Sequence, residues 1–238
     1  MNKSIANYCF AFLLTLPIIV FFLSYWFNHS PDLIPTGFIQ YDNAGYLAYG
    51  KQYLDEDSFH LFYSNPFNDS GNYNKIYFQI QSLLFAIAIK AGIPSVLILP
   101  LFTIICSFLC FRILIKIIDF LLPSNKYRVI SIIFFAWGGG LLFIADIPVQ
   151  LIYPHIKQLL GNKPLILDPG SGWWGLNFGR SLFFSCEAFY HLLFVSTILS
   201  VLKAKWIRSL LLLFLLSSSH PFSGVEEVVW FRFVQSWI

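Results

Sequence analysis

The chain alternates long apolar runs with two extended polar connections. Runs of about 18 or more apolar residues are typical of membrane-spanning helices, because roughly 20 helical residues cross a hydrocarbon core about 30 Å thick. The apolar runs predict membrane segments at 8–27, 76–91, 93–118, 129–147, 181–202 and 206–219, separated by polar connections at 28–75 and 148–180. We therefore predict an all-α fold, a polytopic transmembrane helical bundle, in which residues 1–238 form a single integral membrane domain.

The C-terminal residues form a shorter apolar piece. After residue 219 the chain reads "HPFSGVEEVVWFRFVQSWI", and Pro221 and Gly224 are predicted to break the helix there. The remaining piece, of about 14 residues, is too short to span a bilayer. It either lies against other helices or belongs to a chain truncated at its C-terminus, and we favour truncation.

A helical pattern of a different kind follows the first apolar run. In "GFIQYDNAGYLAYGKQYLDED", residues 37–57, Asp42 precedes Tyr46, Tyr49 and Tyr53, which fall on one helical face. This spacing predicts an amphipathic helix over about 43–54 that lies at the membrane surface and has Asp42 at its start. Seven of the 12 tyrosines lie between 41 and 77, which favours a position at the interface, where aromatic rings with a polar end are enriched.

Composition supports the membrane class. The chain is 57% hydrophobic and 11% charged, whereas ordinary soluble domains are about 25% charged. The formal net charge of +3 is modest and the basic residues form short clusters, so we expect the bilayer and no nucleic acid as a partner. Oligomeric state cannot be derived from these features.

The basic clusters predict the orientation. Lys and Arg gather at 112–128 and 203–208, whereas 28–75 carries six acids and two lysines. Because Lys and Arg favour the cytoplasmic side, we place the two clusters inside and 28–75 outside. Both clusters lie inside if 76–91 is a re-entrant or interfacial helix. The alternative, six full crossings, breaks the charge rule, and we favour the first.

The four cysteines are interpreted as packed or lipid-facing. They all lie in apolar runs, and no histidine or second pair completes a metal site. They are Cys9, Cys106, Cys110 and Cys186.

Two roles are open for Asp42. As an N-cap, its carboxylate accepts a hydrogen bond from a first-turn N–H group. As a functional group, a carboxylate held at the membrane surface could take a proton from an acceptor hydroxyl or hold a divalent metal that binds a phosphate. Spacing alone does not choose between them.

The same stretch resembles the GT-C superfamily, the polytopic glycosyltransferases that use lipid-phosphate sugars and include protein O-mannosyltransferases and aminoarabinose transferases. The resemblance lies in an acid-led surface helix after the first transmembrane segment, with Tyr41, Asp42, Tyr46 and Gly50 matching. The family's second acid is Asn43 here, and family members are longer.

The resemblance implies a function. The protein would transfer a sugar from a polyprenyl-phosphate donor to an acceptor at the outer face of a bacterial inner or plasma membrane. Asp42 would be the catalytic or metal-binding carboxylate. A divalent metal is a candidate cofactor, and the lipid-linked donor is the expected partner.

Further candidate residues lie near the predicted helix ends. Glu187 and His191 are four apart on one helix face, where they form either a mutually satisfied pair or part of a site. His220, in the broken stretch, either caps a helix or lies on the same outer side as Asp42. We expect all three to contact substrate if the enzyme interpretation holds.

The second polar connection contributes three more candidates. Arg180 could hold a phosphate, since its guanidinium matches phosphate geometry. Trp173 and Trp174 either stack on a sugar ring or anchor at the interface.

A second functional class is a transporter-like or inactive, truncated multi-pass protein. Glu187, His191 and the broken helix also suit a translocation path, because transporters build their sites from discontinuous helices near the midplane. Depth distinguishes the two classes. A site at mid-membrane favours transport, and a site under the outer loop favours transfer.

Overall fold

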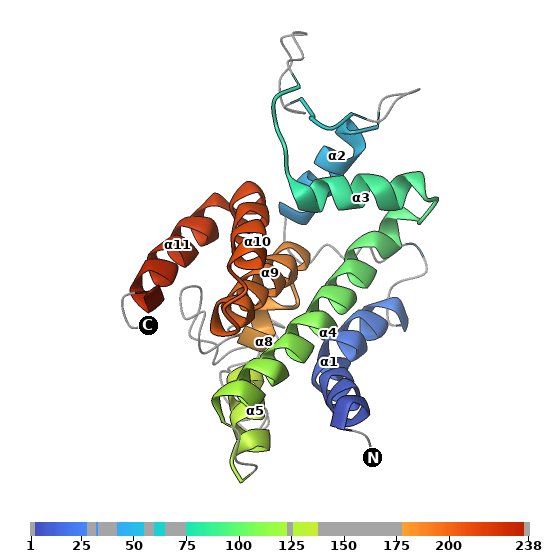
Figure 1. Ribbon diagram of the computed structural model, residues 1–238. Coiled ribbons are helices and arrows are strands. Elements are labelled where there is room, and N and C mark those ends of the chain that lie inside the picture. The colour runs from blue at the N-terminus through green and yellow to red at the C-terminus, as the bar shows by residue number, and fades with distance from the viewer. Residues whose placement is uncertain are drawn as a thin grey trace, which may run out of the picture.

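The computed structural model describes residues 3–27, 32, 42–54, 60–64, 75–122, 126–137 and 178–235, with the side chains of Lys3, Asp42, Arg180 and residues 230–235 outside the description. The predicted all-α fold is confirmed within these ranges (Figure 1). The helices are α1 (Lys3–Phe27), α2 (Asp42–Gln52), α3 (Ile80–Lys90), α4 (Ser95–Leu121), α5 (Arg128–Trp137), α8 (Phe178–Ser181), α9 (Ser185–Leu202), α10 (Trp206–Ser219) and α11 (Pro221–Gln235).

Three helices are long and apolar enough to cross a membrane. They are Ser4–Phe27 of α1, Ser95–Leu121 of α4 and Ser185–Leu202 of α9. They confirm the predicted segments 8–27, 93–118 and 181–202 as helices, so the chain is a multi-pass membrane protein.

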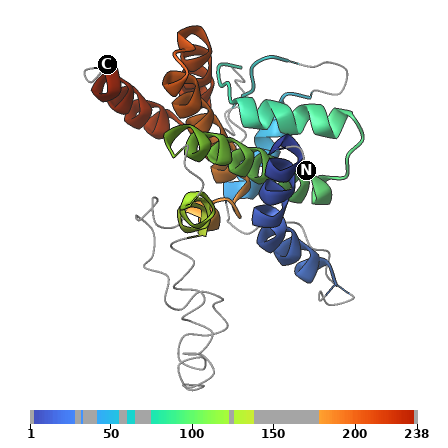
Figure 2. The same ribbon diagram turned by 60° about the horizontal axis from the view of Figure 1, so that its bottom comes forward.

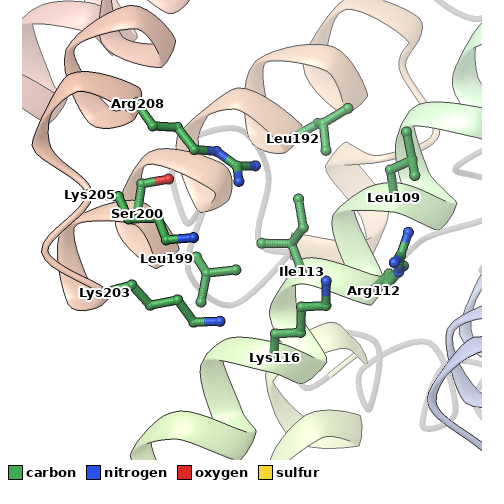
Figure 3. A pocket seen from close by; sticks show the side chains of 10 residues that line it. All are labelled: Leu109, Arg112, Ile113, Lys116, Leu192, Leu199, Ser200, Lys203, Lys205 and Arg208. Carbon is green, nitrogen blue, oxygen red and sulfur yellow. The ribbon is translucent and has the colours of Figure 1, made fainter. Parts of the chain in front are cut away.

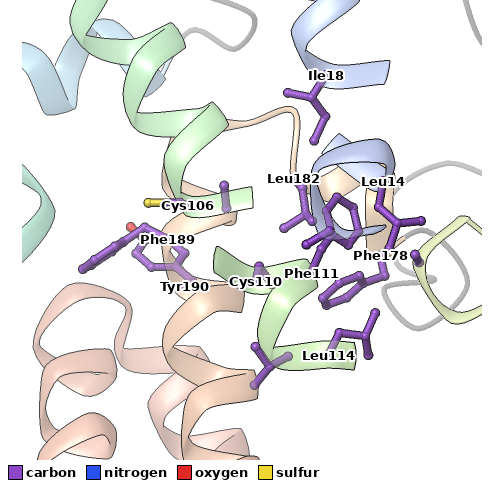
Figure 4. Packing of buried hydrophobic residues seen from close by; sticks show 14 of the residues in the cluster. Leu14, Ile18, Cys106, Cys110, Phe111, Leu114, Phe178, Leu182, Phe189 and Tyr190 are labelled. Carbon is purple, nitrogen blue, oxygen red and sulfur yellow. The ribbon is translucent and has the colours of Figure 1, made fainter. Parts of the chain in front are cut away.

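The helices α4 and α9 pack against each other at the centre of the bundle. The two views place α1 on one side of α4 and the pair α10 and α11 on the other (Figure 1, Figure 2). Buried apolar side chains from α1, α4 and α9 fill the contact, among them Leu14, Phe111, Leu114 and Phe189 (Figure 4). The apolar side chains at the contact between α1, α4 and α9 are therefore buried inside the bundle.

Hydroxyl groups fix the start of α9 against α4. Thr103 Oγ1 lies 2.7 Å from Ser185 Oγ, and Ser107 Oγ donates to the carbonyl oxygen of Leu182 at 3.0 Å. Such bonds satisfy polar groups that would otherwise be costly inside an apolar bundle. These bonds place the first turn of α9 beside the N-terminal half of α4.

A polar network joins three helices at the other end of the bundle. Arg128 of α5 pairs with Asp119 of α4. Its Nη2 also donates to Asn7 Oδ1 of α1 at 2.8 Å, and Asn7 Nδ2 donates to Asp119 Oδ2 at 3.2 Å. These contacts bring the N-terminal turns of α1 and α5 to the C-terminus of α4.

The predicted surface helix is α2, and it packs on α3. Its buried face is formed by Asn43, Leu47 and Gly50, whereas the sequence pattern predicts a tyrosine face. Tyr46 and Tyr49 are half-buried beside that face, and their rings meet edge to face at 5.9 Å. The difference arises because α3 covers the small and aliphatic side of α2, a contact that the pattern of α2 alone does not reveal.

Tyr53 ties the end of α2 to the start of α3. Its buried hydroxyl accepts a hydrogen bond from the Gln79 N–H group at 2.9 Å and lies 3.2 Å from the Gln79 carbonyl oxygen. The ring also packs on that of Tyr63, with centroids 5.1 Å apart. The aromatic concentration in the sequence thus forms a packed cap over one end of the bundle.

The helix α3 is too short to span a bilayer. Its 11 residues extend about 16 Å at ~1.5 Å per residue, about half of a typical hydrocarbon core. This length is consistent with the preferred prediction that 76–91 is re-entrant or interfacial. The helix α5 covers Arg128–Trp137 of the predicted segment 129–147, and residues 138–147 lie outside the described residues.

The helices α10 and α11 form a tight hairpin. Pro221 begins α11, so the predicted break at Pro221 is confirmed. The predicted break at Gly224 is wrong, because Gly224 lies inside α11. A Cβ atom there would lie 2.7 Å from Ser217 Cα, so this glycine permits close approach of α10 and α11.

Candidate functional site

The start of α2 meets the first turn of α9. Asn43, the second residue of α2, is 1% exposed, and the Cys186 thiol lies 3.9 Å from Asn43 Oδ1. Glu187 follows Cys186 directly along α9. The backbone of Asp42 therefore begins α2 one residue from the contact between α2 and α9.

Glu187 and His191 form the predicted i,i+4 pair. His191 Nδ1 lies 2.7 Å from the Glu187 carbonyl oxygen and 3.9 Å from Glu187 Oε2. A carbonyl oxygen only accepts hydrogen bonds, so Nδ1 carries the proton and Nε2 of the neutral ring is an acceptor. The His191 ring meets Phe178 edge-on at 5.3 Å, which helps to fix its orientation.

His220 joins this group from the hairpin between α10 and α11. Its ring stacks on that of Tyr190, the residue before His191 on α9, with centroids 4.5 Å apart. The N–H group of Ser223 donates to His220 Nδ1 at 3.3 Å, so His220 caps α11, one of its two predicted roles. Burial lowers the pKa of His220, and the charge of Glu226 partly offsets this.

Polar side chains without partners surround the group. Among the described residues, the Tyr190 hydroxyl, both amide atoms of Gln81 and Asn43 Nδ2 are buried and have no hydrogen-bond partner. The Tyr190 hydroxyl faces Tyr46 and Gln81. A buried polar group left unpaired costs about 1–3 kcal/mol, so this interior suits a polar ligand. We call Asn43, Gln81, Glu187, Tyr190, His191 and His220 the α2–α9 cluster.

A second buried acid lies on α11, near the C-terminal half of α9. Glu227 of α11 is 1% exposed and lies near Thr197 of α9. Neither of its carboxylate oxygens has a partner among the residues that the structure describes. Burial raises the pKa of Glu227 from 4.5 to about 8, so the carboxyl group favours its neutral form.

Several predicted residues fall outside the description. These are the side chains of Asp42 and Arg180, together with Trp173 and Trp174. The structure thus brings Glu187, His191 and His220 together and gives the start of α2, but it does not describe these four side chains.

No group of three or more His, Cys, Asp or Glu side chains that could hold a metal ion is found within the described ranges. Three of the four cysteines, Cys106, Cys110 and Cys186, are buried, and Cys9 is exposed. The cluster offers one carboxyl group and two imidazoles, which suit proton transfer and hydrogen bonding to hydroxyl or phosphate groups.

Comparison with protein-family models, with curated proteins and with solved structures finds no match to this chain.

Proposed function

We propose that this chain is a membrane glycosyltransferase-like protein of the GT-C type. It transfers a sugar from a polyprenyl-phosphate donor to an acceptor at the outer face of the membrane. The observation that carries the proposal is the contact between the first turns of α2 and α9. This contact sets the start of the acid-led helix beside Glu187, His191 and His220.

The depth of the cluster supports transfer over transport. Glu187 lies in the first turn of α9, and His220 ends α10. The group therefore lies at one end of the span Ser185–Leu202, under α2 and α3. A transporter site is typically near the midplane.

The distribution of charge supports an outer position for the cluster. The cations Arg112, Lys116, Lys203 and Arg208 lie together at the opposite end of α4 and α9. Because Lys and Arg favour the cytoplasmic side, that end faces the cytoplasm and the cluster faces outward. Polyprenyl-phosphate donors of this class are used at that outer face.

Asp42 is proposed as the general base or as the ligand of a metal that binds the donor phosphate. In transfer, the acceptor hydroxyl oxygen bonds to the anomeric carbon and its proton passes to Asp42. The bond between the anomeric carbon and the phosphate oxygen breaks, and its electrons leave with the polyprenyl phosphate. Arg180 is proposed to hold that phosphate.

The remaining groups are proposed to position substrate. His191 Nε2 can accept a hydrogen bond from a sugar hydroxyl, since Nδ1 is occupied by the Glu187 carbonyl oxygen. His220 can donate from Nε2, because Nδ1 accepts from Ser223. Trp173 and Trp174 are proposed to stack on the sugar ring.

Replacement of Asp42 tests the proposal. Membranes that contain the protein, and with it hydroxyl-bearing acceptors, are given a short-chain polyprenyl phosphate carrying radiolabelled mannose or aminoarabinose, and release of polyprenyl phosphate is measured. We expect Asp42→Asn to lower the rate by about 10²–10⁴-fold, the usual contribution of a general base. The matched control is Asp32→Asn, an exposed acid in the same connection, which should retain the rate.

Two results contradict the proposal. Wild-type protein that releases no polyprenyl phosphate from either donor excludes this donor class. Equal rates for wild type and Asp42→Asn remove Asp42 from the chemistry.

A further inference from the structure

A basic cavity lies at the end of the bundle away from the α2–α9 cluster. It has a volume of about 450 Å³ and lies between α4, the end of α9 and the start of α10. Five cationic side chains line it, and no carboxylate is among its lining residues (Figure 3). The cations are Arg112, Lys116, Lys203, Lys205 and Arg208.

The fold draws these charges together from separate elements. Arg112 and Lys116 are one helical turn apart on α4. The turn between α9 and α10 brings the other three, and it is unusually tight, because Ala204 has a φ of 51°. This left-handed conformation is strained for a residue other than glycine. Lys203 and Lys205 flank Ala204, and Figure 3 shows their amines directed toward α4.

The charges of the cavity are close enough to act on one another. Arg112, Lys203 and Arg208 each interact electrostatically with Lys116. The acid on the same helix, Asp119, pairs with Arg128. Like charges held together favour an anion between them, and the amino end of α10 adds the positive end of its dipole.

The lining is not only basic. Leu109, Ile113, Leu192 and Leu199 form its apolar wall. A cavity with cations and an apolar wall at the end of two membrane spans matches an amphipathic ligand with an anionic head. Arg208 suits phosphate in particular, because a guanidinium binds two phosphate oxygens at once. The Arg112 guanidinium lies over the ring of Tyr8 of α1, 4.1 Å from its centroid, so Arg112 adds positive charge to the cavity wall.

We propose that this cavity binds a phosphate group. The group belongs either to the headgroup of an anionic lipid in the adjoining leaflet or to a free phosphate. The preference of cations for the cytoplasmic side accounts for basic residues at this end. That preference does not explain why five cations line one cavity. Lys126 lies at the same end but is not among the lining residues; its Nζ lies 5.5 Å from the centroid of the Tyr127 ring. The inference is independent of sugar transfer.

The test measures binding to the whole purified chain in a neutral detergent. The probes are phosphatidylglycerol, phosphatidylcholine and inorganic phosphate, titrated while Tm and bound ligand are followed. The variants are Lys203→Gln and Arg208→Gln. Both side chains belong to exposed residues, so the variants should fold. Lys126→Gln is the matched control, with the same loss of charge at the same end.

We expect phosphatidylglycerol to bind and raise Tm and phosphatidylcholine to have no effect. Each cavity variant should weaken binding about five-fold, the effect of one cation near an anionic lipid surface. Lys126→Gln should bind as wild type does. Binding of inorganic phosphate with the same loss in both cavity variants would support the site with a free anion as its ligand.

Two results would overturn the proposal. In one, neither anion binds better than phosphatidylcholine. In the other, Lys126→Gln weakens binding as much as Lys203→Gln and Arg208→Gln, so that only net charge matters.

Discussion

The buried carboxyl group of Glu227 shows how a single residue responds to the packing of two helices. It lies on the face of α11 that meets α9, whereas its neighbour Glu226 is exposed. Because a buried carboxyl group loses the hydration that favours its charged form, the pKa of Glu227 is raised to about 8. Glu227 is therefore mostly neutral over the acidic and near-neutral range.

Stability should depend on pH through this residue. The pKa of Glu227 rises from 4.5 to about 8 on folding, so between these values the folded state holds a proton that the unfolded state has lost. Stability should fall as pH rises through this window and level off above it. Thermal unfolding in detergent from pH 4 to 9 measures the slope.

Glu227→Gln imitates the protonated group and should flatten that slope. Glu226→Gln is the control and should leave it unchanged. If the stability of Glu227→Gln still falls with pH as that of the wild type does, groups other than Glu227 cause the pH dependence.

Residue patterns predicted part of the cluster. The i,i+4 spacing identified Glu187 and His191 as a pair, and the polar break identified His220. The burial of the Glu227 carboxyl group was not predicted. Glu226 and Glu227 are adjacent and chemically identical, and only the packing of α11 on α9 decides which of them is buried. Gln81 was likewise missed, since its burial depends on α2 and α9, far away in sequence.

At the scale of elements, α2 and α3 are joined by close backbone contact. A Cβ atom at Gly50 would lie 3.0 Å from Phe85 Cβ and 3.1 Å from the Ser82 carbonyl oxygen. Small residues allow helices in membranes to approach in this way. Gly50, one of the residues matching the GT-C pattern, therefore has a packing role.

Two glycines of α2 provide a matched comparison. In Gly45→Ala the new Cβ meets Tyr49 only at ordinary contact distance, 3.9 Å, so the gain in helix propensity, up to ~1 kcal/mol, should show as neutral or higher stability. Gly50→Ala has the same gain but crowds α3, and overpacking costs about 1–3 kcal/mol. We expect Gly50→Ala to be less stable than Gly45→Ala by about that amount in thermal or denaturant unfolding. Equal stability would mean that α3 yields without cost.

Elements with long apolar runs were predicted well, because length and hydropathy are local properties. The helices α1, α4 and α9 begin and end within a few residues of their predictions, except for the longer N-terminal start of α1 and the later start of α9. The buried face of α2 and the position of Gly224 inside α11 were not predicted. Both depend on a partner helix, and a glycine that breaks a helix looks the same in sequence as one that lets two helices meet.

At the scale of the whole molecule, the two ends of the bundle differ in chemistry. One end holds α2, α3 and the α2–α9 cluster, with the carboxyl group of Glu187, two imidazoles and several tyrosines. The other holds the basic cavity and the network of Arg128, Asp119 and Asn7. This polarity separates a proposed reaction site from a proposed phosphate site. Because Lys and Arg favour the cytoplasmic side, it also predicts which end faces the cytoplasm.

The contact between the first turns of α2 and α9 is the central claim, and cysteine crosslinking tests it most directly. Cys186 is present already, and Asn43→Cys adds its partner in a background of Cys9→Ala, Cys106→Ala and Cys110→Ala. After mild oxidation in membranes, mass spectrometry of proteolytic peptides detects the link between positions 43 and 186.

Ala44→Cys is the control, because Ala44 is exposed on another face of α2. We predict a disulfide between residues 43 and 186 in the Asn43→Cys protein and little or none for Ala44→Cys. If Asn43→Cys links to Cys186 no faster than Ala44→Cys does, α2 does not begin beside Glu187, and the proposed site fails with it.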